Sequence, residues 1–459
     1  MNKNQFQAKA NKKQLTLTPV KLVLYKQTKI IESTDPHANF YYIIYYKNNF
    51  INGVKANKIR LHSYIHQAFK NGIHFDGTHP LVNQLIQSEQ SFHFIKFNQL
   101  IKTLPKSYTK KEIAFVFLFF NSFTKPGSSK NLFKNTFYDF RRNGQDFSAY
   151  QALKYYSNYN PKDKFVFDMI HNIEFQRYEK QYKELETILE NDPNYAELIC
   201  FENRNNKDTA ERLFSLYKDQ NRVFDEIAVR IDLLKHSFTE ENYQNLETLL
   251  NELPFDVQIG ILTNLIKADH AEIVEKKLLS LLLESGLSNN VTEFLLTSKF
   301  EPTPEQLPII IKQIEQTEDE VLIANFKQAN KRLLALSGQN SKTLERLVKP
   351  FVSAALDTFE LTDIINWFQP FRDAHLHLPI EKKVIKMKQL ANDPDRQFAL
   401  GEMYLDFHQW EKSIDCFKWE MELHPEDPKP VNYLSKIYNE IGNKDEAKAY
   451  QQLMVQMNK

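Results

Sequence analysis

The sequence predicts an all-α protein in which antiparallel helix pairs stack into an α-solenoid, with a basic, aromatic-rich helical domain at the N-terminus. Three observations support this prediction. Only 10 of the 459 residues are glycine, about 2% against an average near 7%, which disfavours turn-rich β folds. The chain is longer than the roughly 250–300 residues that one hydrophobic core serves. Helix start and stop signals recur along it, and its C-terminus repeats with a fixed period.

Residues 1–157 are expected to form the helical N-terminal domain. Thr18-Pro19 and Asp35-Pro36 each combine a capping side chain with a proline that suits the first turn of a helix. Residues 15–25 alternate in part between apolar and polar side chains, which would allow a strand there. Because Thr18-Pro19 lies inside this segment, a helix start is the preferred interpretation.

Charge is distributed unequally along the chain. Residues 1–150 contain 22 Lys and Arg against 7 Asp and Glu, a net charge of +15, although the whole protein carries only +1. A basic domain favours a polyanion, such as a nucleic acid or an acidic protein surface, as partner. The same residues hold 26 of the 59 aromatic side chains, which could stack on bases. Alternatively, the aromatics fill a core, and the lysines solubilise it or dock on the acidic half of the chain.

A helical hairpin is predicted from residues 109–123 and 129–142. Thr109 and Glu112 have the spacing of a capping box at its start. The basic face of its second helix is the candidate nucleic-acid site, formed by Lys130, Asn131, Lys134, Arg141 and Arg142. Only three arginines occur in residues 1–150, which disfavours base readout, so an ordinary helical hairpin stays the alternative.

Residues 158–393 are expected to form degenerate helical repeats. Asp192-Pro193 is a helix start signal of the kind described above, and Gly286 and Gly338 end apolar-periodic segments. Within the segments, apolar residues recur at spacings of three and four, which indicates helices with one buried face.

Residues 394–459 contain the periodic signal. Leu400, Gly401, Tyr404, Ser413 and Phe417 recur 34 residues later as Leu434, Ser435, Tyr438, Ala447 and Gln451. These spacings resemble the tetratricopeptide repeat (TPR), and residues 161–194 resemble it in part. The resemblance implies repeats of two antiparallel helices, in which small residues such as Gly401 and Ala447 allow close helix approach.

The resemblance also implies a binding surface. In this family the first helices of the repeats line a concave groove that binds a peptide or a protein partner. The corresponding positions here are Phe398, Glu402, Leu405, Asn432, Lys436 and Asn439. The leading prediction is therefore a non-enzymatic interaction or scaffold protein. The alternative is a nucleic-acid-associated regulator that combines the basic N-terminal domain with a TPR-like sensing or recruiting domain.

No motif for catalysis, a metal or a cofactor is evident, so neither enzymatic activity nor a bound cofactor is expected. His62 and His66 lie four residues apart, but no glutamate follows the first histidine as in metalloproteases. Cys200 and Cys416 are expected to be buried thiols in the cytoplasm. No secretory signal is predicted, because the first twenty residues are basic and polar and contain no apolar core. No membrane-spanning segment is predicted, because the longest apolar run covers only residues 113–120. The sequence leaves open whether the protein forms a homo-oligomer.

Overall fold

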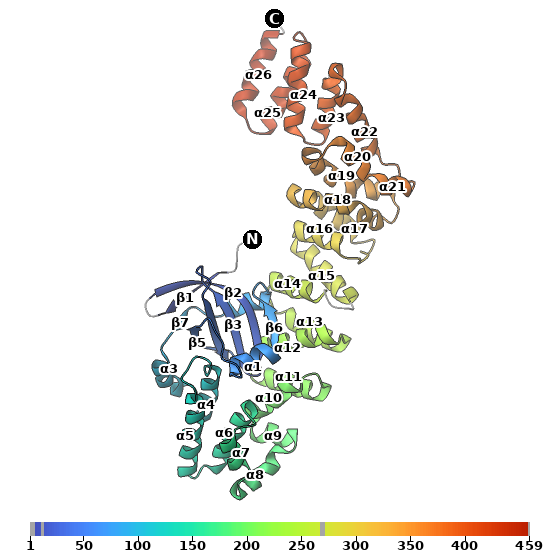
Figure 1. The fold of residues 1–459 in the computed structure, drawn as a ribbon. Coiled ribbons are helices and arrows are strands. Elements are labelled where there is room, and N and C mark those ends of the chain that lie inside the picture. The colour runs from blue at the N-terminus through green and yellow to red at the C-terminus, as the bar shows by residue number, and fades with distance from the viewer. Residues whose placement is uncertain (1–4, 11–12, 267–270, 458–459) are drawn as a thin grey trace. The chain divides into compact units, whose positions relative to one another are not determined.

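A computed structural model describes residues 5–10, 13–266 and 271–457. The chain divides into two compact units, residues 1–271 and 272–459, which are described separately below (Figure 1).

The prediction of an all-α protein is wrong for the N-terminal part of the first unit. A mixed seven-stranded sheet, close to a barrel, occupies this part instead of helices (Figure 1). The strands are β1 Phe6–Ala10, β2 Lys13–Tyr25, β3 Thr28–Thr34, β4 Phe40–Tyr46, β5 Asn49–Lys55, β6 Ile73–Asp76 and β7 Phe92–Phe94. Their order is β5-β4-β3-β2-β1-β7, and β6 pairs with β2.

Two local features explain why these residues form strands. The β4 sequence FYYIIYY consists of aromatic and β-branched residues, which fit a pleated surface that is buried on both faces. Pro19, interpreted above as a helix start, lies in β2 at an irregularity of the register with β3, where a missing N–H is tolerated. Asp35-Pro36 is also a turn rather than a helix start, because the Asp35 carboxylate accepts bonds from the backbone N–H of His37 and Asn39.

Hairpin turns form here without glycine. Lys26 and Lys47 begin the two-residue turns after β2 and β4, and both adopt a left-handed backbone with φ of 55° and 51°. That conformation costs a non-glycine residue roughly 1–2 kcal/mol. Both side chains form tertiary contacts that offset this cost: Lys26 Nζ lies 2.6 Å from a Glu202 carboxylate oxygen, and Lys47 Nζ donates to Asn194 Oδ1 at 2.7 Å.

The two edges of the sheet approach each other at β5 and β7. The Asn52 side chain donates to the backbone oxygen of Ile95 at 2.8 Å and accepts from its N–H at 2.9 Å. A Cβ atom on Gly53 would lie only 2.1 Å from the Phe94 ring, so glycine is required for this close approach. The Asn52 amide thus replaces part of a backbone ladder between these edges.

Helices complete the first unit. They are α1 Tyr64–Asn71, α2 Pro80–Gln87, α3 Phe97–Thr103, α4 Lys110–Phe119, α5 Ser128–Arg142, α6 Asp146–Tyr159, α7 Lys164–Ile170, α8 Gln176–Glu179, α9 Leu185–Asn191, α10 Pro193–Glu202, α11 Lys207–Asp219, α12 Val223–His236, α13 Glu240–Leu250 and α14 Phe255–Leu265. Short 3-10 helices cover Leu104–Lys106, Ile173–Phe175 and Lys180–Tyr182.

Aromatic side chains fill the core of this unit, as one of the two sequence interpretations expected. On one face of β4, Tyr45 contacts Phe92, and on the other face Tyr46 contacts Phe115 and Phe119 of α4. Tyr45 and Tyr46 are both almost fully buried. These rings are therefore occupied inside the protein and cannot stack on bases.

A buried ionic cluster joins the sheet to the helices. Lys29 of β3 lies 2.7 Å from Asp225 of α12, and Arg222 lies 2.6 Å from Glu197 of α10 and 3.2 Å from Asp225. Gln27 donates to Glu197 at 2.7 Å. The four charged side chains are at most 1% exposed. Part of the basic charge of residues 1–150 is thus neutralised by acidic residues of the same chain.

Burial and charge act in opposite directions on this cluster. Burial alone would raise the pKa of Asp225, but the charges of Arg222 and Lys29 and their hydrogen bonds outweigh burial and lower that pKa. For Lys29, burial dominates and lowers the pKa, and the Asp225 charge offsets only part of this effect.

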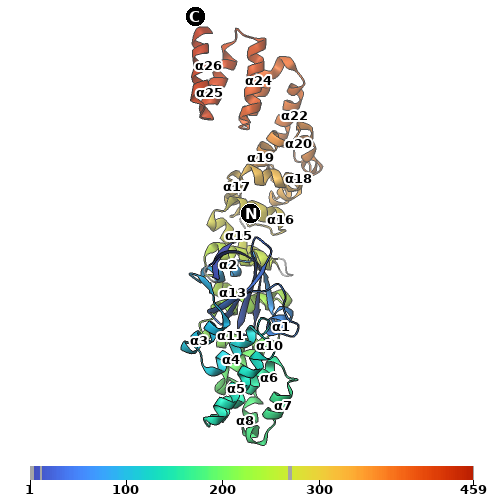
Figure 2. The same ribbon diagram turned by 60° about the vertical axis from the view of Figure 1, so that its left-hand side comes forward.

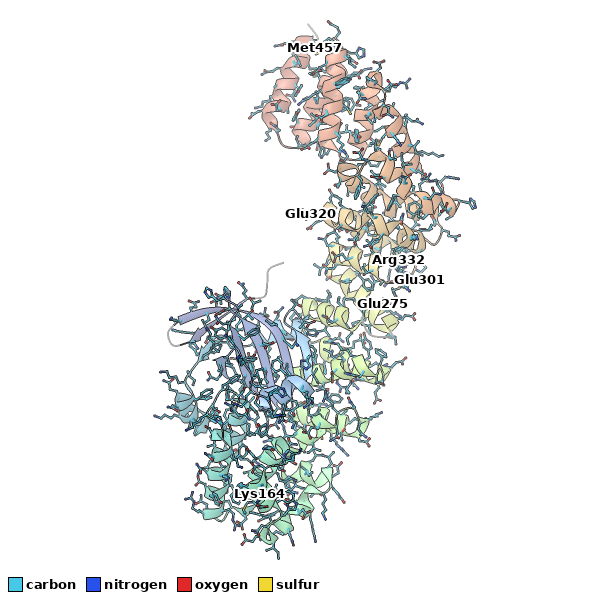
Figure 3. The ribbon with its side chains drawn as sticks, viewed as in Figure 1. Lys164, Glu275, Glu301, Glu320, Arg332 and Met457 are labelled. Atoms are coloured by element: carbon cyan, nitrogen blue, oxygen red, sulfur yellow. The ribbon has the colours of Figure 1, made fainter. Side chains whose placement is uncertain are left out.

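The second unit is an array of helices, seen from two directions in Figures 1 and 2. They are α15 Ala271–Ser285, α16 Ser288–Thr297, α17 Leu307–Glu315, α18 Asp319–Leu336, α19 Ser341–Thr358, α20 Leu361–Trp367, α21 Gln369–Asp373, α22 Pro379–Ala391, α23 Gln397–Asp406, α24 Trp410–Leu423, α25 Pro428–Glu440 and α26 Lys444–Met457, with a 3-10 helix at Pro394–Arg396. Figure 3 labels Arg332 of α18 close to Glu275 and Glu301. Burial lowers the pKa of Arg332, and these two carboxylates offset part of that effect.

The predicted helix pairs at residues 394–459 are confirmed as α23 with α24 and α25 with α26. Ser413 Oγ donates to the carbonyl oxygen of Gly401 at 2.8 Å, and Ser435 Oγ donates to that of Ala447 at 3.3 Å. Because Gly401 and Ser413 recur 34 residues later as Ser435 and Ala447, the two pairs cross at equivalent positions. The hydroxyl comes from the second helix of one pair and from the first helix of the other.

Several local signals are confirmed as well. Thr109 and Glu112 form the predicted capping box of α4, and Pro193 begins α10. Gly286 and Gly338 adopt left-handed backbones, with φ of 67° and 55°. Among the described residues, no helix is long and apolar enough to cross a membrane.

Candidate functional site

An open groove lies on the helices α11, α12 and α13. Its volume is about 520 Å³. Asn206 caps α11 by accepting from the N–H groups of Asp208 and Thr209, and Thr239 caps α13. The groove is lined by Arg204, Asn205, Lys207, Ala210, Glu211, Phe214, Arg230, Leu233, His236, Ser237, Thr239, Glu241, Asn242 and Asn245.

An aromatic ring and a guanidinium group stack on each other in this groove. The guanidinium carbon of Arg230 lies 3.9 Å from the centre of the Phe214 ring. Two bonds to Glu226 Oε1, at 2.9 and 2.7 Å, and one to Asn242 Oδ1, at 2.8 Å, hold the guanidinium in place. Arg230 thus has its charge paired, and the stack provides a rigid, partly apolar surface.

A weaker ion pair crosses from α11 to α13. Lys207 Nζ lies 3.0 Å from Glu241 and 3.7 Å from Glu211, and the hydrogen bond to Glu241 raises the pKa of Lys207. These side chains are exposed, so water screens the pair and a ligand can displace it at little cost.

Two amides complete the groove. Asn205 and Asn245 are exposed, and in the described part of the chain their side chains have no hydrogen-bond partner. An amide offers both a donor and an acceptor, which matches the N–H and C=O groups of an extended peptide. The groove therefore combines apolar, amide and paired ionic side chains, and it suits binding better than acid or base catalysis.

The predicted partner-binding residues lie on the first helices of the C-terminal pairs. Phe398 contacts the rings of Phe417 and Tyr433. Phe398 and Leu405 both pack against an apolar cluster, so both contribute to helix packing. The cluster consists of Ile414, Phe417, Leu434 and Ile437. Glu402 is exposed and accepts a bond from the Tyr433 hydroxyl at 2.7 Å.

The remaining three partner-binding positions lie on α25. Lys436 and Asn439 are exposed, and Asn432 is half-buried. These residues share a helix with Tyr433, and the Lys436 ammonium group lies 5.8 Å from the centre of the Tyr433 ring.

The predicted nucleic-acid residues lie on α5, but most of their charges have partners. Lys130 pairs with Asp163 at 2.6 Å, Arg141 with Asp146 at 2.7 Å and Arg142 with Asp139 at 2.6 Å. The remaining two are Lys134, whose ammonium group lies 4.3 Å from the centre of the Phe165 ring, and the exposed Asn131. These contacts leave little free charge on α5 to enter a groove of DNA.

The cysteines are buried free thiols, as predicted. Burial raises the pKa of Cys200 to about 11 and that of Cys416 to about 12. Neither thiol is therefore an activated nucleophile at neutral pH.

No protein-family model matches the chain, and no curated protein matches its sequence.

Sequence reasoning missed the groove on α11–α13. Its residues are spread over about 40 positions and carry no repeat spacing, so neither period nor motif joins them. The available signal was chemical: asparagines at 205, 242 and 245 lie in a helical region, where they are poor helix formers.

Proposed function

We propose that the protein is a non-enzymatic interaction protein that binds an extended peptide segment of a partner in the groove of α11–α13. The supporting observation is the combination of the half-buried Phe214 ring, stacked on the buried Arg230 guanidinium, with the side-chain amides of Asn205 and Asn245. Apolar contacts would supply affinity, and amides would pair with the peptide backbone.

The C-terminal pairs support a second part of the same proposal. Their 34-residue spacing resembles that of TPR-like repeats, which act as protein-binding arrays. Exposed Glu402, Lys436 and Asn439 would provide the polar contacts there. The two buried thiols favour a cytoplasmic location.

The test uses the full-length chain as bait for a displayed library of random peptides. We expect enriched sequences that bind the wild type and lose at least about tenfold in affinity with Asn245→Arg. Gln244→Arg is the matched control, because Gln244 is exposed on the same helix but does not line the groove. The proposal is wrong if no sequence is enriched, or if both variants leave binding unchanged.

A further inference from the structure

A second cleft, of about 610 Å³, lies in the first unit and is rich in positive charge. It is formed by the segment before α1, the turn between α4 and α5, the end of α6 and the loop that leads to α7. This site is separate from the groove of α11–α13 and does not depend on the function proposed for it.

Four cationic side chains line the cleft: Arg60, Lys125, Lys130 and Lys162. No carboxylate is among the lining residues that the structure describes. Only Lys130 has an ion-pair partner in the described part of the chain, the buried Asp163 at 2.6 Å. The charges of the other three cations are therefore available to an anion.

Arg60 is held in place without being neutralised. Its guanidinium donates to the carbonyl oxygens of Asn121 at 2.7 Å and Thr124 at 2.9 Å. Its backbone N–H donates to Ser122 Oγ at 2.7 Å. Neutral carbonyl acceptors orient the guanidinium and leave its full positive charge in the cleft.

Backbone donors add to this positive potential. Gly127, with φ of 81°, precedes α5, and the helix has no side-chain cap. The N–H groups of Ser129 and Lys130 belong to the first turn, where no intrahelical acceptor exists, and both residues line the cleft. Such N–H groups and the helix dipole favour an anion, here in addition to the three free cationic side chains.

A network of hydrogen bonds among residues at the cleft fixes its shape. Asn121 Nδ2 donates to the Tyr159 hydroxyl at 2.7 Å, and this hydroxyl donates to the carbonyl oxygen of His62 at 3.0 Å. Asn121 Oδ1 also accepts from the N–H of Tyr64 at 3.0 Å. Because these bonds tie α1, α6 and the turn after α4 together, the cationic groups are positioned before a ligand arrives.

We propose that this cleft binds a small phosphate-bearing ligand of nucleotide size, with Arg60, Lys125 and Lys162 on its phosphate oxygens. The clustering of charge in one bounded cleft favours a compact polyanion over a long strand. A nucleic-acid strand would need further free cations along its path. Arg141 and Arg142 of α5, however, are paired with carboxylates.

Calorimetric titration of the full-length chain tests this proposal, with inorganic tripolyphosphate, ATP and a short single-stranded oligonucleotide as separate probes. The variant is Lys125→Glu/Lys162→Glu, since both side chains are exposed and their reversal should not affect folding. Lys102→Glu/Lys106→Glu is the matched control, with the same change of net charge at exposed positions outside the cleft.

We expect tripolyphosphate and ATP to bind the wild type and the control alike, and the cleft variant to lose at least about tenfold in affinity. Absence of binding of both probes near 50 mM salt would overturn the proposal. Equal losses in the two variants would also overturn it, because they would show a non-specific effect of net charge. If the oligonucleotide binds more tightly than ATP and the cleft variant abolishes this binding, the proposal of a small ligand is wrong and the cleft binds nucleic acid instead.

Discussion

The sheet–helix junction of the first unit and the C-terminal helix pairs of the second are stabilised in different ways. The junction depends on buried charges from distant parts of the sequence, with Lys29 paired to Asp225. The C-terminal pairs pack around an apolar cluster that includes Phe417 and Leu434. Their helices cross at small residues, with one hydroxyl–carbonyl bond per pair between residues twelve apart. The comparison shows that local packing leaves a readable spacing in the sequence, whereas a long-range ionic contact leaves none.

The largest effect is expected at the junction. Asp225→Asn would leave Lys29 and Arg222 buried with one carboxylate fewer, at a cost of about 3–5 kcal/mol in the free energy of unfolding. Urea denaturation measures this change, and Asp219→Asn, at an exposed position near the same helices, is the control. A loss below about 1 kcal/mol would mean that the cluster does not hold the sheet on the helices.

The destabilisation caused by Asp225→Asn should also depend on pH. The pKa of Asp225 is lower in the folded than in the unfolded protein, so its stabilising contribution is complete above the unfolded value of about 3.9. That contribution is lost as the pH falls through the lowered pKa. The difference in unfolding free energy between wild type and Asp225→Asn should therefore shrink below about pH 4. A constant difference down to acid denaturation would argue against a charged Asp225.

An intermediate effect is expected at the first C-terminal crossing. A Cβ atom on Gly401 would lie 3.0 Å from the Phe417 ring and 3.1 Å from Cys416 Cβ. Gly401→Val should therefore overpack the crossing and lower the free energy of unfolding by about 1–3 kcal/mol. Gly401→Ala should cost less, because alanine gains up to about 1 kcal/mol of helix propensity over glycine. Hydrogen exchange should show the loss in the second unit only. Asp415→Val, at an exposed position of α24, controls for the helix propensity of valine.

The smallest effect tests whether the two crossings are equivalent. Ser413→Ala removes the 2.8 Å bond to Gly401, and Ser435→Ala removes the 3.3 Å bond to Ala447. Each should cost about 0.5–1.5 kcal/mol, with the larger loss for the shorter bond. Thermal unfolding of both variants measures the difference. A change at one site alone would show that the pairs are related in sequence but not in energetics.

Part of the fold was predictable because its causes are local. The capping box at Thr109 and Glu112, the start of α10 at Pro193 and the C-terminal pairs all involve residues close in sequence. The sheet was missed because its turns use Lys26 and Lys47 where glycine or asparagine is the usual signal. In addition, β4 is buried on both faces, so its sequence does not alternate.

The candidate sites were less predictable than the fold. Lys130 was singled out for a DNA-reading helix, and the structure places it in the lining of the cationic cleft, which also includes Arg60, some 70 residues earlier in the chain. The charge count predicted a basic N-terminal region, but it could not show which lysines pair with carboxylates and which remain free.

The sequence by itself determined the helix pairs, their 34-residue spacing and the excess of positive charge at the N-terminus, because periodicity and composition are properties of neighbouring residues. Only the tertiary structure decided that Lys29 is buried against Asp225 and that Arg60, Lys125 and Lys162 share one cleft. The physical reason is distance along the chain. Burial and the electric field at a charged group depend on atoms from distant segments that folding brings together, and no pattern of neighbouring residues reveals those contacts.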